Sequence, residues 1–514
     1  MKVIPQLILA ALIFSSLTAI GFLPIESPVM NVTIEEQTQR AVYSLTPHGA
    51  ISINSNYNFN QTAINEGWDG NGSESDPFII EGYLFTNDGS CISIHSTTVY
   101  FIIRDCEFTT AGGTDNQYAL NIVNVLHGTL NSSFIHDKVG GIFLDYSYGF
   151  RLINTNISNI ALNGVDLHCS DGALLENNTF TKTGVMITGY VASGWHHTFT
   201  NNLVNGKPLG YFRSSNNIYI DGSLYGQIIL AECTNCHVSD ALIANASVGI
   251  ALGHSTSCSV ELSNVSWNKF GILISKCDDI DVVNNTSGPF NEYGIHLNDS
   301  SNCFIGGNEI FNNSQNGFDA VAGTNNVVEY NTVYGNAFCG IVNWEGSAMT
   351  IDHNTVYDNG DGIAVYSSPD SVITHNTVQN NTGVGITVGW GSTDCSVHYN
   401  WIGWNAGGNA LDDGSSNLWD DDLNVGNYWE DYLGTGTYLI PGGAGSIDRY
   451  PFSIYGDPTT PITTTPTTTT TTTTNTTTTS VSTGIVIDPL LLAIGGSATL
   501  IVVLVLGFVL GRKH

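Results

Sequence analysis

The stretch from Gly317 to Val388 decides the fold, because one short motif returns in it four times. Its four copies are Gly317-Phe-Asp-Ala, Gly340-Ile-Val-Asn, Gly362-Ile-Ala-Val and Gly385-Ile-Thr-Val, with starting glycines 23, 22 and 23 residues apart. A fixed period in this range is typical of a repeat protein whose units stack into a solenoid. Upstream, the same motif or a near variant begins at Gly141, Gly164, Gly184, Gly226, Gly249, Gly271 and Gly294.

Each repeat contains short segments in which apolar residues alternate with more variable ones. A second such segment follows the glycine motif, as in Val328-Glu-Tyr-Asn-Thr-Val and Ile373-Thr-His-Asn-Thr-Val. Alternation over three to five residues predicts short strands with one face turned inward. Repeats of this length can each wind one coil of a parallel β-helix, whose strands pair with their equivalents about 4.8 Å away. We therefore predict an all-β parallel β-helix of about fourteen coils over residues 89–410.

One interval breaks the period. Gly184 and Gly226 are 42 residues apart, nearly two repeats, so one coil between them lacks a clear glycine motif. Residues 45–88 and 411–457 also lack the repeat. Because a solenoid has to cover the strand edges at both of its ends, we assign these two segments as N-terminal and C-terminal caps.

Two residue types recur through the coils. Asn tolerates the left-handed backbone of a sharp corner, and amides stacked coil on coil can hydrogen-bond as a ladder. Most of the ten cysteines fall in separate coils, so we predict free thiols buried in the interior, in place of disulfides. The recurring asparagines are Asn178, Asn308, Asn331, Asn354, Asn376 and Asn400.

The two ends of the chain predict an exported protein that is held at a membrane. The apolar run in residues 1–26 is typical of a signal peptide or an N-terminal anchor. Residues 458–484 are rich in Thr and resemble an O-glycosylated stalk. Residues 485–510 carry no charge after Asp488 and are long enough for a transmembrane helix, and the basic tail 511–514 should stay in the cytoplasm. We expect a single-pass protein of the cell membrane with a large extracellular N-terminal part.

The charge balance excludes one class of partner. Lys and Arg number 13 against 45 Asp and Glu, which gives a formal net charge of −32. A surface this acidic repels phosphate backbones, so we expect no nucleic-acid partner.

Several motifs resemble the NosD-like family of right-handed β-helix repeats. They are Asn205-Gly-Lys-Pro-Leu-Gly-Tyr, the coils of the form Asn-x5-Asn-x2-Gly-Ile, and Gly426-Asn-Tyr-Trp-Glu-Asp-Tyr with Asp448-Arg-Tyr-Pro. Repeats of this type also occur in carbohydrate-binding proteins, sugar hydrolases and many archaeal surface proteins. The segment from Glu66-Gly-Trp-Asp-Gly-Asn-Gly through Asp76-Pro-Phe-Ile-Ile-Glu-Gly is similar to the opening of those surface proteins. The resemblance covers residues 50–455 and implies a right-handed parallel β-helix, a fold that hosts lyases, hydrolases, epimerases and inert spikes.

Large aromatic residues return in three successive coils near the end of one strand. Trp344 and Tyr366 stand four residues after their glycines, and Trp390 stands five after Gly385. Rings with an apolar face and a polar tip suit the faces of pyranose sugars. A ladder of rings covered by a loop would give the same pattern. We predict a glycan-binding row and a role in recognition, adhesion or the cell envelope, with an extracellular glycan or a surface protein as the partner.

A second pattern suggests catalysis. His296 and Asp319 each stand two residues after the glycine of successive coils, where the side chain should point outward. A His–carboxylate pair one strand spacing apart can serve general acid–base chemistry, although a solvated surface pair would look the same. The alternative function is therefore a lyase, epimerase or hydrolase that acts on extracellular polysaccharide.

Two patterns concern metal ions. Asp69, Asn71, Ser73 and Asp76 place oxygens around glycines as hard-cation loops do, which makes calcium the one cofactor we consider. The acidic cluster Asp420–Asp422 in the C-terminal cap also crowds charge that a cation would relieve. His353 and His375 should stack in adjacent coils, but two ligands make a poor metal site. NosD-like copper handling, which the resemblance suggests, is the second alternative.

Overall fold

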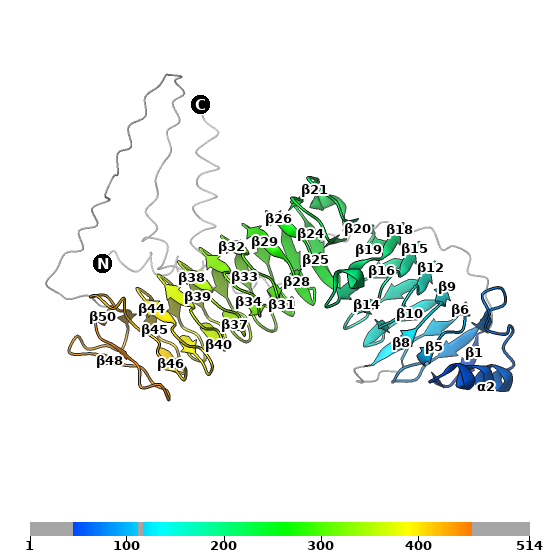
Figure 1. Ribbon diagram of the computed structural model, residues 1–514, viewed down its shortest axis with the longest axis horizontal. Helices are drawn as coiled ribbons and strands as arrows, with labels where there is room; N and C mark the ends of the chain where they lie inside the picture. The colour runs from blue at the N-terminus through cyan, green and yellow to red at the C-terminus, as the bar shows by residue number, and fades with distance from the viewer. Residues whose placement is uncertain (1–44, 111–116, 455–514) are drawn as a thin grey trace, which may run out of the picture. The chain divides into compact units, whose positions relative to one another are not determined.

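The computed structural model describes residues 45–110 and 117–454. Nearly all of this chain forms short strands, stacked coil on coil between helix α2 (Asn56–Glu66) and strand β50 (Phe452–Ser453) (Figure 1). The fold is the predicted right-handed parallel solenoid, with about sixteen turns where about fourteen were expected. The difference arises because strands from both segments assigned as caps join the outermost coils.

The first part of the solenoid, residues 46–204, is named here the N-terminal stack, and each of its coils contributes one strand to each of three parallel sheets. The first sheet holds β2 (Ile51–Ile53), β5 (Ile92–Thr97), β8 (Tyr118–Val125), β11 (Gly140–Asp145), β14 (Val165–His168) and β17 (Val185–Thr188). The second holds β3 (Phe78–Glu81), β6 (Phe101–Arg104), β9 (Gly128–Asn131), β12 (Arg151–Ile153), β15 (Leu174–Glu176) and β18 (Thr198–Thr200). The third holds β1 (Thr46–His48), β4 (Tyr83–Phe85), β7 (Glu107–Phe108), β10 (Phe134–His136), β13 (Asn156–Ser158), β16 (Thr179–Thr181) and β19 (Leu203–Val204).

The C-terminal stack, residues 207–454, repeats this arrangement. Its first sheet holds β20 (Lys207–Arg213), β22 (Gln227–Ala231), β25 (Val248–Gly253), β28 (Phe270–Ser275), β31 (Tyr293–Asn298), β34 (Phe318–Val321), β37 (Ile341–Trp344), β40 (Ile363–Tyr366), β43 (Ile386–Val388) and β46 (Ala410–Asp412). Its second holds β21 (Tyr219–Asp221), β23 (His237–Ser239), β26 (Thr256–Glu261), β29 (Asp278–Val283), β32 (Phe304–Gly306), β35 (Val327–Glu329), β38 (Thr350–Asp352), β41 (Val372–Thr374) and β44 (Ser396–His398). Its third holds β24 (Leu242–Ala244), β27 (Asn264–Ser266), β30 (Thr286–Ser287), β33 (Glu309–Phe311), β36 (Thr332–Tyr334), β39 (Thr355–Tyr357), β42 (Thr377–Gln379), β45 (Trp401–Gly403), β47 (Tyr428–Trp429) and β50. Outside the sheets lie two 3-10 turns, η1 (Ala192–Trp195) and η2 (Gly222–Leu224), and the antiparallel pair β48 (Tyr438–Leu439) and β49 (Ile447–Asp448).

The core is a set of vertical columns of inward-facing apolar side chains. The glycine of each motif is required by close packing between coils, since a Cβ on Gly294 would lie 2.5 Å from the carbonyl oxygen of Gly317. The residue after each glycine then points inward. One such column, fully buried, consists of Ile272, Ile295, Phe318, Ile341, Ile363 and Ile386. All ten cysteines are free, and eight of them are buried, as the sequence predicted.

The predicted asparagine ladder is present, but its members do not hold the left-handed corners. In each rung the side-chain oxygen of one Asn accepts from the backbone N–H and the side-chain amide of the Asn one coil earlier, as Asn354 does from Asn331 at 3.0 and 2.9 Å. The left-handed conformation belongs to the residue before each ladder Asn, for example Tyr330, His353 and His375, with φ between 53° and 56°. The expectation that Asn itself occupies the left-handed position at these corners was therefore wrong.

The 42-residue interval contains the coil that lacked a glycine motif. The chain enters it through a hairpin in which β19 pairs antiparallel with β20 across Asn205-Gly206, two residues with positive φ that suit a tight turn. Strand β17 ends its sheet here, whereas β20 pairs with β19 on one side and with β22 on the other and so links the third sheet of the N-terminal stack to the first sheet of the C-terminal stack. The side chain of Gln227 takes the place of the missing strand, because its oxygen accepts from the N–H of Val185 and its amide donates to the carbonyl of the same residue.

The segment assigned as the C-terminal cap buries two tryptophans, Trp419 and Trp429, completely. The negative charge of the neighbouring acidic cluster is partly neutralised by Arg449, which donates hydrogen bonds to both oxygens of the buried Asp420 and to one oxygen of Asp422. The cation that this cluster was expected to attract is thus a side chain of the protein itself.

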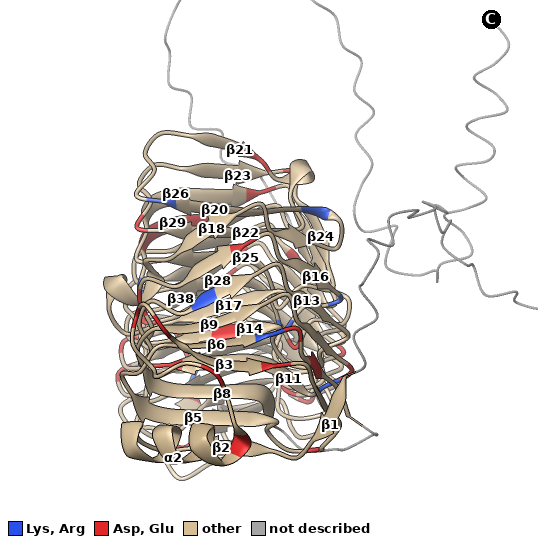
Figure 2. Cartoon of the chain, turned by 90° about the vertical axis from the view of Figure 1, so that its right-hand side faces the viewer, with Lys and Arg blue, Asp and Glu red and all other residues tan. Residues whose placement is uncertain are grey.

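The expected signal peptide or anchor, stalk, transmembrane helix and tail lie outside the described residues. Within residues 45–110 and 117–454, no helix is long and apolar enough to cross a bilayer. Figure 2 shows that acidic and basic residues are scattered along the coils of the described chain.

Candidate functional site

The predicted aromatic row begins with a stacked pair. Trp344 at the end of β37 is in register with Tyr366 at the end of β40, and their ring centroids lie 4.2 Å apart with 14° between the planes. Both side chains are half-buried. The buried residues between each ring and the glycine of its motif fill the inward positions, so the two rings lie on the outer side of the coil. The pair therefore presents one continuous aromatic surface two coils wide.

Trp390 does not continue this stack. The position in register with Tyr366 is taken by Gly389, against which the Tyr366 ring packs so closely that a Cβ would lie 2.1 Å from its Cδ1. Trp390 instead follows one residue later, where its carbonyl accepts from the N–H of Ser367, and its side chain is 60% exposed. Trp390 thus lies beside the pair as a separate ring, and no other ring of the described residues packs on it.

The two candidate catalytic residues are neighbours, as their spacing predicted. His296 and Asp319 are in register on β31 and β34, and Nδ1 of the imidazole lies 2.6 Å from Oδ2 of the carboxylate. The pair is less accessible than an outward position suggested, with side-chain exposures of 15% and 7%. Asp319 also accepts from the side-chain amide of Asn316, and the rings of Phe270 and Tyr293 lie near the imidazole. Asp319 is thus placed to orient His296, and the imidazole is the more exposed of the two groups and the one that a ligand could contact.

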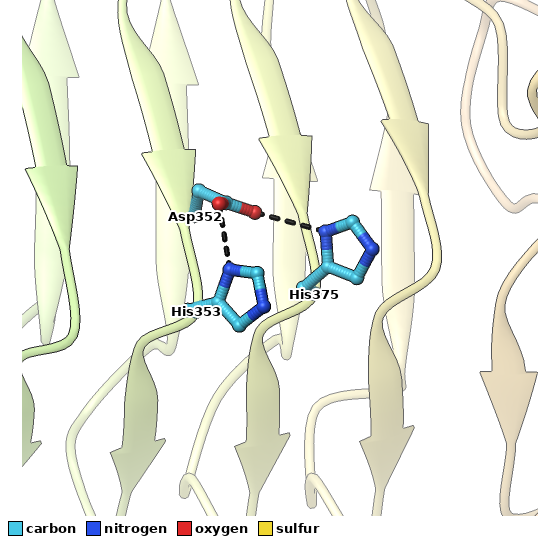
Figure 3. A group of neighbouring side chains, drawn as sticks. All are labelled: Asp352, His353 and His375. Carbon is cyan, nitrogen blue, oxygen red and sulfur yellow. Dashed lines mark hydrogen bonds and ion pairs between the residues drawn. The ribbon is translucent and has the colours of Figure 1, made fainter. Parts of the chain in front are cut away.

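The two stacked histidines are joined by a third group that the sequence analysis missed. His353 and His375 stack at 4.6 Å, and the carboxylate of Asp352 bonds Nδ1 of both, at 2.6 and 3.0 Å (Figure 3). Burial raises the pKa of Asp352, but hydrogen bonds from Thr374, His353 and His375 outweigh it and hold the pKa below its usual value. One ligand atom from each of the three residues lies within 4.8 Å of the others. Two imidazoles and a carboxylate form a donor set that suits Cu²⁺ or Zn²⁺.

The candidate calcium loop is an exposed turn near α2. The four residues Asp69, Asn71, Ser73 and Asp76 are all exposed, and the side-chain oxygen of Asn71 already accepts from the N–H of Ser73. Backbone bonds between Asn71 and Asp76 close the turn. The loop therefore holds its shape through its own hydrogen bonds, and calcium binding there stays a prediction.

Comparison with known families identifies the repeat. A family model described as "Right handed beta helix region" matches residues 67–224 and 226–343, which is more than half of the chain. A second model, described as "Periplasmic copper-binding protein (NosD)", matches residues 287–434. The chain belongs to the NosD-like right-handed β-helix family. Its aromatic pair, its His296–Asp319 pair and its histidine cluster all lie within the segment matched by the NosD model.

Other members of the β-helix fold are only distantly similar to this NosD-like chain. The periplasmic alginate epimerase AlgG is 14% identical, with a TM-score of 0.32, over 79% of this chain and 84% of that one. The AlgE4 A-module, a mannuronan C-5 epimerase of Azotobacter vinelandii, is 11% identical, with a TM-score of 0.27, over 77% and 92%. The Dettilon tailspike protein is 14% identical, with a TM-score of 0.25, over 78% and 72%. At these scores the similarity says nothing about activity, and no curated protein is detectably similar to the chain.

A groove in this NosD-like solenoid was also missed from the sequence. It has a volume of about 450 Å³ and is lined by residues of both stacks, among them Lys182, Trp267, Lys269 and Phe290. The signal was in the sequence, because Trp267 and Phe290 are one period apart. These two rings stand at a corner of the coil, whereas Trp344 and Tyr366 stand at strand ends, so the two rows do not share a position relative to the glycine motif.

Proposed function

We propose that the protein is a membrane-anchored glycan-binding protein of the cell surface. The observation that carries the proposal is the Trp344–Tyr366 pair, in which two large rings stack across adjacent coils and remain half-exposed. A pyranose ring packs its C–H face on such a surface, and the rigid rings lose little conformational entropy when they bind it. Trp390, exposed beside the pair, supplies a further ring for the next sugar of the chain.

The export and anchoring in this proposal are supported by the sequence of the two termini. An apolar run at residues 1–26, a Thr-rich segment at 458–484 and an uncharged segment at 485–510 are the parts of a stalked, single-pass surface protein. The partner is then an extracellular glycan, free or carried by another surface protein.

The aromatic pair is tested on the full chain by retention on a glycan array. Trp344→Ala and Tyr366→Ala should each weaken retention by about tenfold, because each removes one stacking contact worth about 1–2 kcal/mol. Tyr357→Ala is the matched control, since Tyr357 stacks on Tyr334 at 5.1 Å in the third sheet, away from the pair. Retention that survives both changes, or that falls equally in the control, would count against the proposal.

Catalysis on a polysaccharide remains the alternative, and His296 would be the group that meets the substrate. A histidine oriented by a carboxylate is an arrangement that general bases use. Incubation of the full chain with uronic-acid and neutral polysaccharides tests it. Cleavage or epimerisation that is lost in His296→Gln would establish an enzyme and replace the binding-only function.

Metal handling is a second candidate function, favoured by the Asp352–His353–His375 cluster. The NosD model that matches this part of the chain is described as copper-binding. Asp352, His353 and His375 would hold the ion, which would displace the protons between the carboxylate and the imidazoles. Titration of the full chain with Cu²⁺ should then show one site that His375→Gln removes and that His168→Gln, a change at a different Asp-bonded histidine, leaves intact. Equal binding by both variants would refute the site.

A further inference from the structure

The groove between the two stacks arises from a local shortening of the coil. At this corner a residue with positive φ is followed by a loop that leads to the next glycine motif. The loop runs from Asn159 to Gly164 in one coil and from Asn312 to Gly317 in another, but only from Lys182 to Gly184 at the junction. The loops of the coils between these two, which begin at Lys182, Asn245, Trp267 and Phe290, are all shorter, and they leave a hollow of about 450 Å³.

Two aromatic rings form one side of this junction groove. Trp267 and Phe290 occupy the corner position of adjacent coils, with ring centroids 4.2 Å apart, and each is 54% exposed. Their φ angles are 58° and 67°, in the left-handed region that bulky residues rarely adopt. The same corner holds Asn in the coils of Asn245 and Asn312. Positive φ is common at the corners of this solenoid, so the feature that distinguishes these two positions is the pair of exposed rings.

Two lysines line the same groove. Lys182 comes from the short loop, and Lys269 follows Trp267 by two residues. Neither ammonium forms an ion pair with a carboxylate of residues 45–110 or 117–454. By contrast Lys276 and Arg104 are both paired with acidic side chains. The ammonium of Lys269 lies 5.8 Å from the centre of the Phe270 ring. With Glu292 as the one acidic residue of the lining, the hollow carries a net positive charge in a chain with a net charge of −32.

The floor of the groove also holds a polar atom without a partner. Thr183 is 2% exposed and lines the groove, and its buried hydroxyl makes no hydrogen bond within the described chain. Because this oxygen has no exposed surface, it marks imperfect packing beneath the groove and lies out of reach of a ligand. Glu292, which also lines the groove, can accept hydrogen bonds from the hydroxyls of a sugar.

From these observations we propose that the junction groove binds a uronic-acid residue of an acidic polysaccharide. The sugar ring packs on Trp267 and Phe290, its carboxylate lies between the ammonium groups of Lys182 and Lys269, and one of its hydroxyls donates to Glu292. The proposal rests on the glycan-binding function and narrows its ligand to acidic glycans. It places this binding at a second site, in a corner between the stacks and outside the sheet that carries Trp344 and Tyr366.

Calorimetric titration of the full chain with a short oligogalacturonate, and with the same oligomer as its methyl ester, tests the groove. The double variant Lys182→Gln/Lys269→Gln should lower affinity for the acidic oligomer by about tenfold or more and leave the ester unchanged. Added salt should weaken the acidic complex alone. The charge-matched control Arg104→Gln/Lys276→Gln removes two cations that pair elsewhere and should leave both affinities as they are.

The outcomes separate this proposal from the one on which it rests. Equal affinity of the wild type and the double lysine variant for the acidic oligomer overturns the groove, and so does equal weakening for acid and ester. If neutral glycans still depend on Trp344 in that case, the glycan-binding function survives. If acidic binding depends on the lysines while Trp344→Ala changes nothing, the aromatic pair fails and the groove stands. A chain that binds neither oligomer overturns the groove assignment.

Discussion

One guanidinium organises the C-terminal end of the solenoid. Arg449 donates through Nε and Nη2 to the two oxygens of Asp420, which is fully buried, and through Nη2 to Asp422. Burial raises the pKa of Asp420, but the hydrogen bonds from Arg449 and from the N–H of Asp422 outweigh it and hold the pKa below its usual value. The Asp448-Arg-Tyr-Pro motif is therefore part of the packing of this end.

This ion pair predicts a stability that depends on pH. Because the pKa of Asp420 is lowered on folding, its contribution is present above the unfolded value of about 3.9 and is lost as pH falls through the folded value. Asp420→Asn should lower the free energy of unfolding at pH 7 by about 2 kcal/mol, discounted because Arg449 is partly solvated. Thermal unfolding at pH 7 and at pH 3 measures it, and the gap between the two proteins should narrow at pH 3. A gap that stays constant with pH would contradict this role.

Residue positions that follow the period were predictable, and those that depart from it were not. The register of Trp344 with Tyr366 and of His296 with Asp319 follows from counting along the repeat. Trp390 stands one residue beyond the position in register with Tyr366. That position is held by Gly389, because a side chain there would collide with the Tyr366 ring. Asp352 was missed because it lies on the strand before the corner, and its contact with His375 crosses to the next coil.

At the scale of the element, the ladder of asparagines connects neighbouring coils. Asn354 accepts from the N–H and the side-chain amide of Asn331 and donates to the carbonyl of Val328, so each rung satisfies backbone groups that water cannot reach. The stacking of identical residues was predictable from the period. The placing of the left-handed corner one residue earlier was not, since both positions tolerate Asn.

Removing one rung should therefore destabilise the solenoid strongly. Asn354→Ala removes the acceptor of the Asn331 N–H and the side-chain donor to the carbonyl of Val328, at a cost of about 3 kcal/mol, while the side-chain amide of Asn331 keeps its bonds to Ile305 and Glu329. Chemical denaturation followed by tryptophan fluorescence measures the loss. Thr355→Ala, a change at the adjacent half-buried residue, is the control and should cost less than about 1 kcal/mol. Equal effects of the two changes would show that the ladder adds little.

At the scale of the whole described chain, one of the three sheets is interrupted at the junction of the two stacks. The strand β17 bonds the side chain of Gln227 where other coils have a pairing strand, while β19 and β20 keep the third sheet continuous. The sequence marked this place as an irregular interval. It could not show the hairpin or the amide, because neither follows the repeat.

The junction predicts that the two stacks lose structure separately. In a solenoid each coil is stabilised by its neighbours, so a weak interface divides the cooperative unit. Gln227→Leu should destabilise β14 and β17 by about 1–3 kcal/mol and leave β37 and β40 unchanged. Hydrogen exchange of the four strands measures this, with Gln379→Leu, a half-buried glutamine on β42, as the control. Uniform loss of protection along the chain would refute a weak junction.

The asparagine ladder also has a direction, and its last rung closes the molecule. Asn427 donates its N–H to Asp448, whose carboxylate also accepts from the indole of Trp429 and from the N–H of Tyr450. A carboxylate accepts hydrogen bonds but, when ionised, has none to give, so the series of donors stops there. A second molecule placed end to end would find no template for another coil. We therefore expect this end to resist end-to-end growth into fibres.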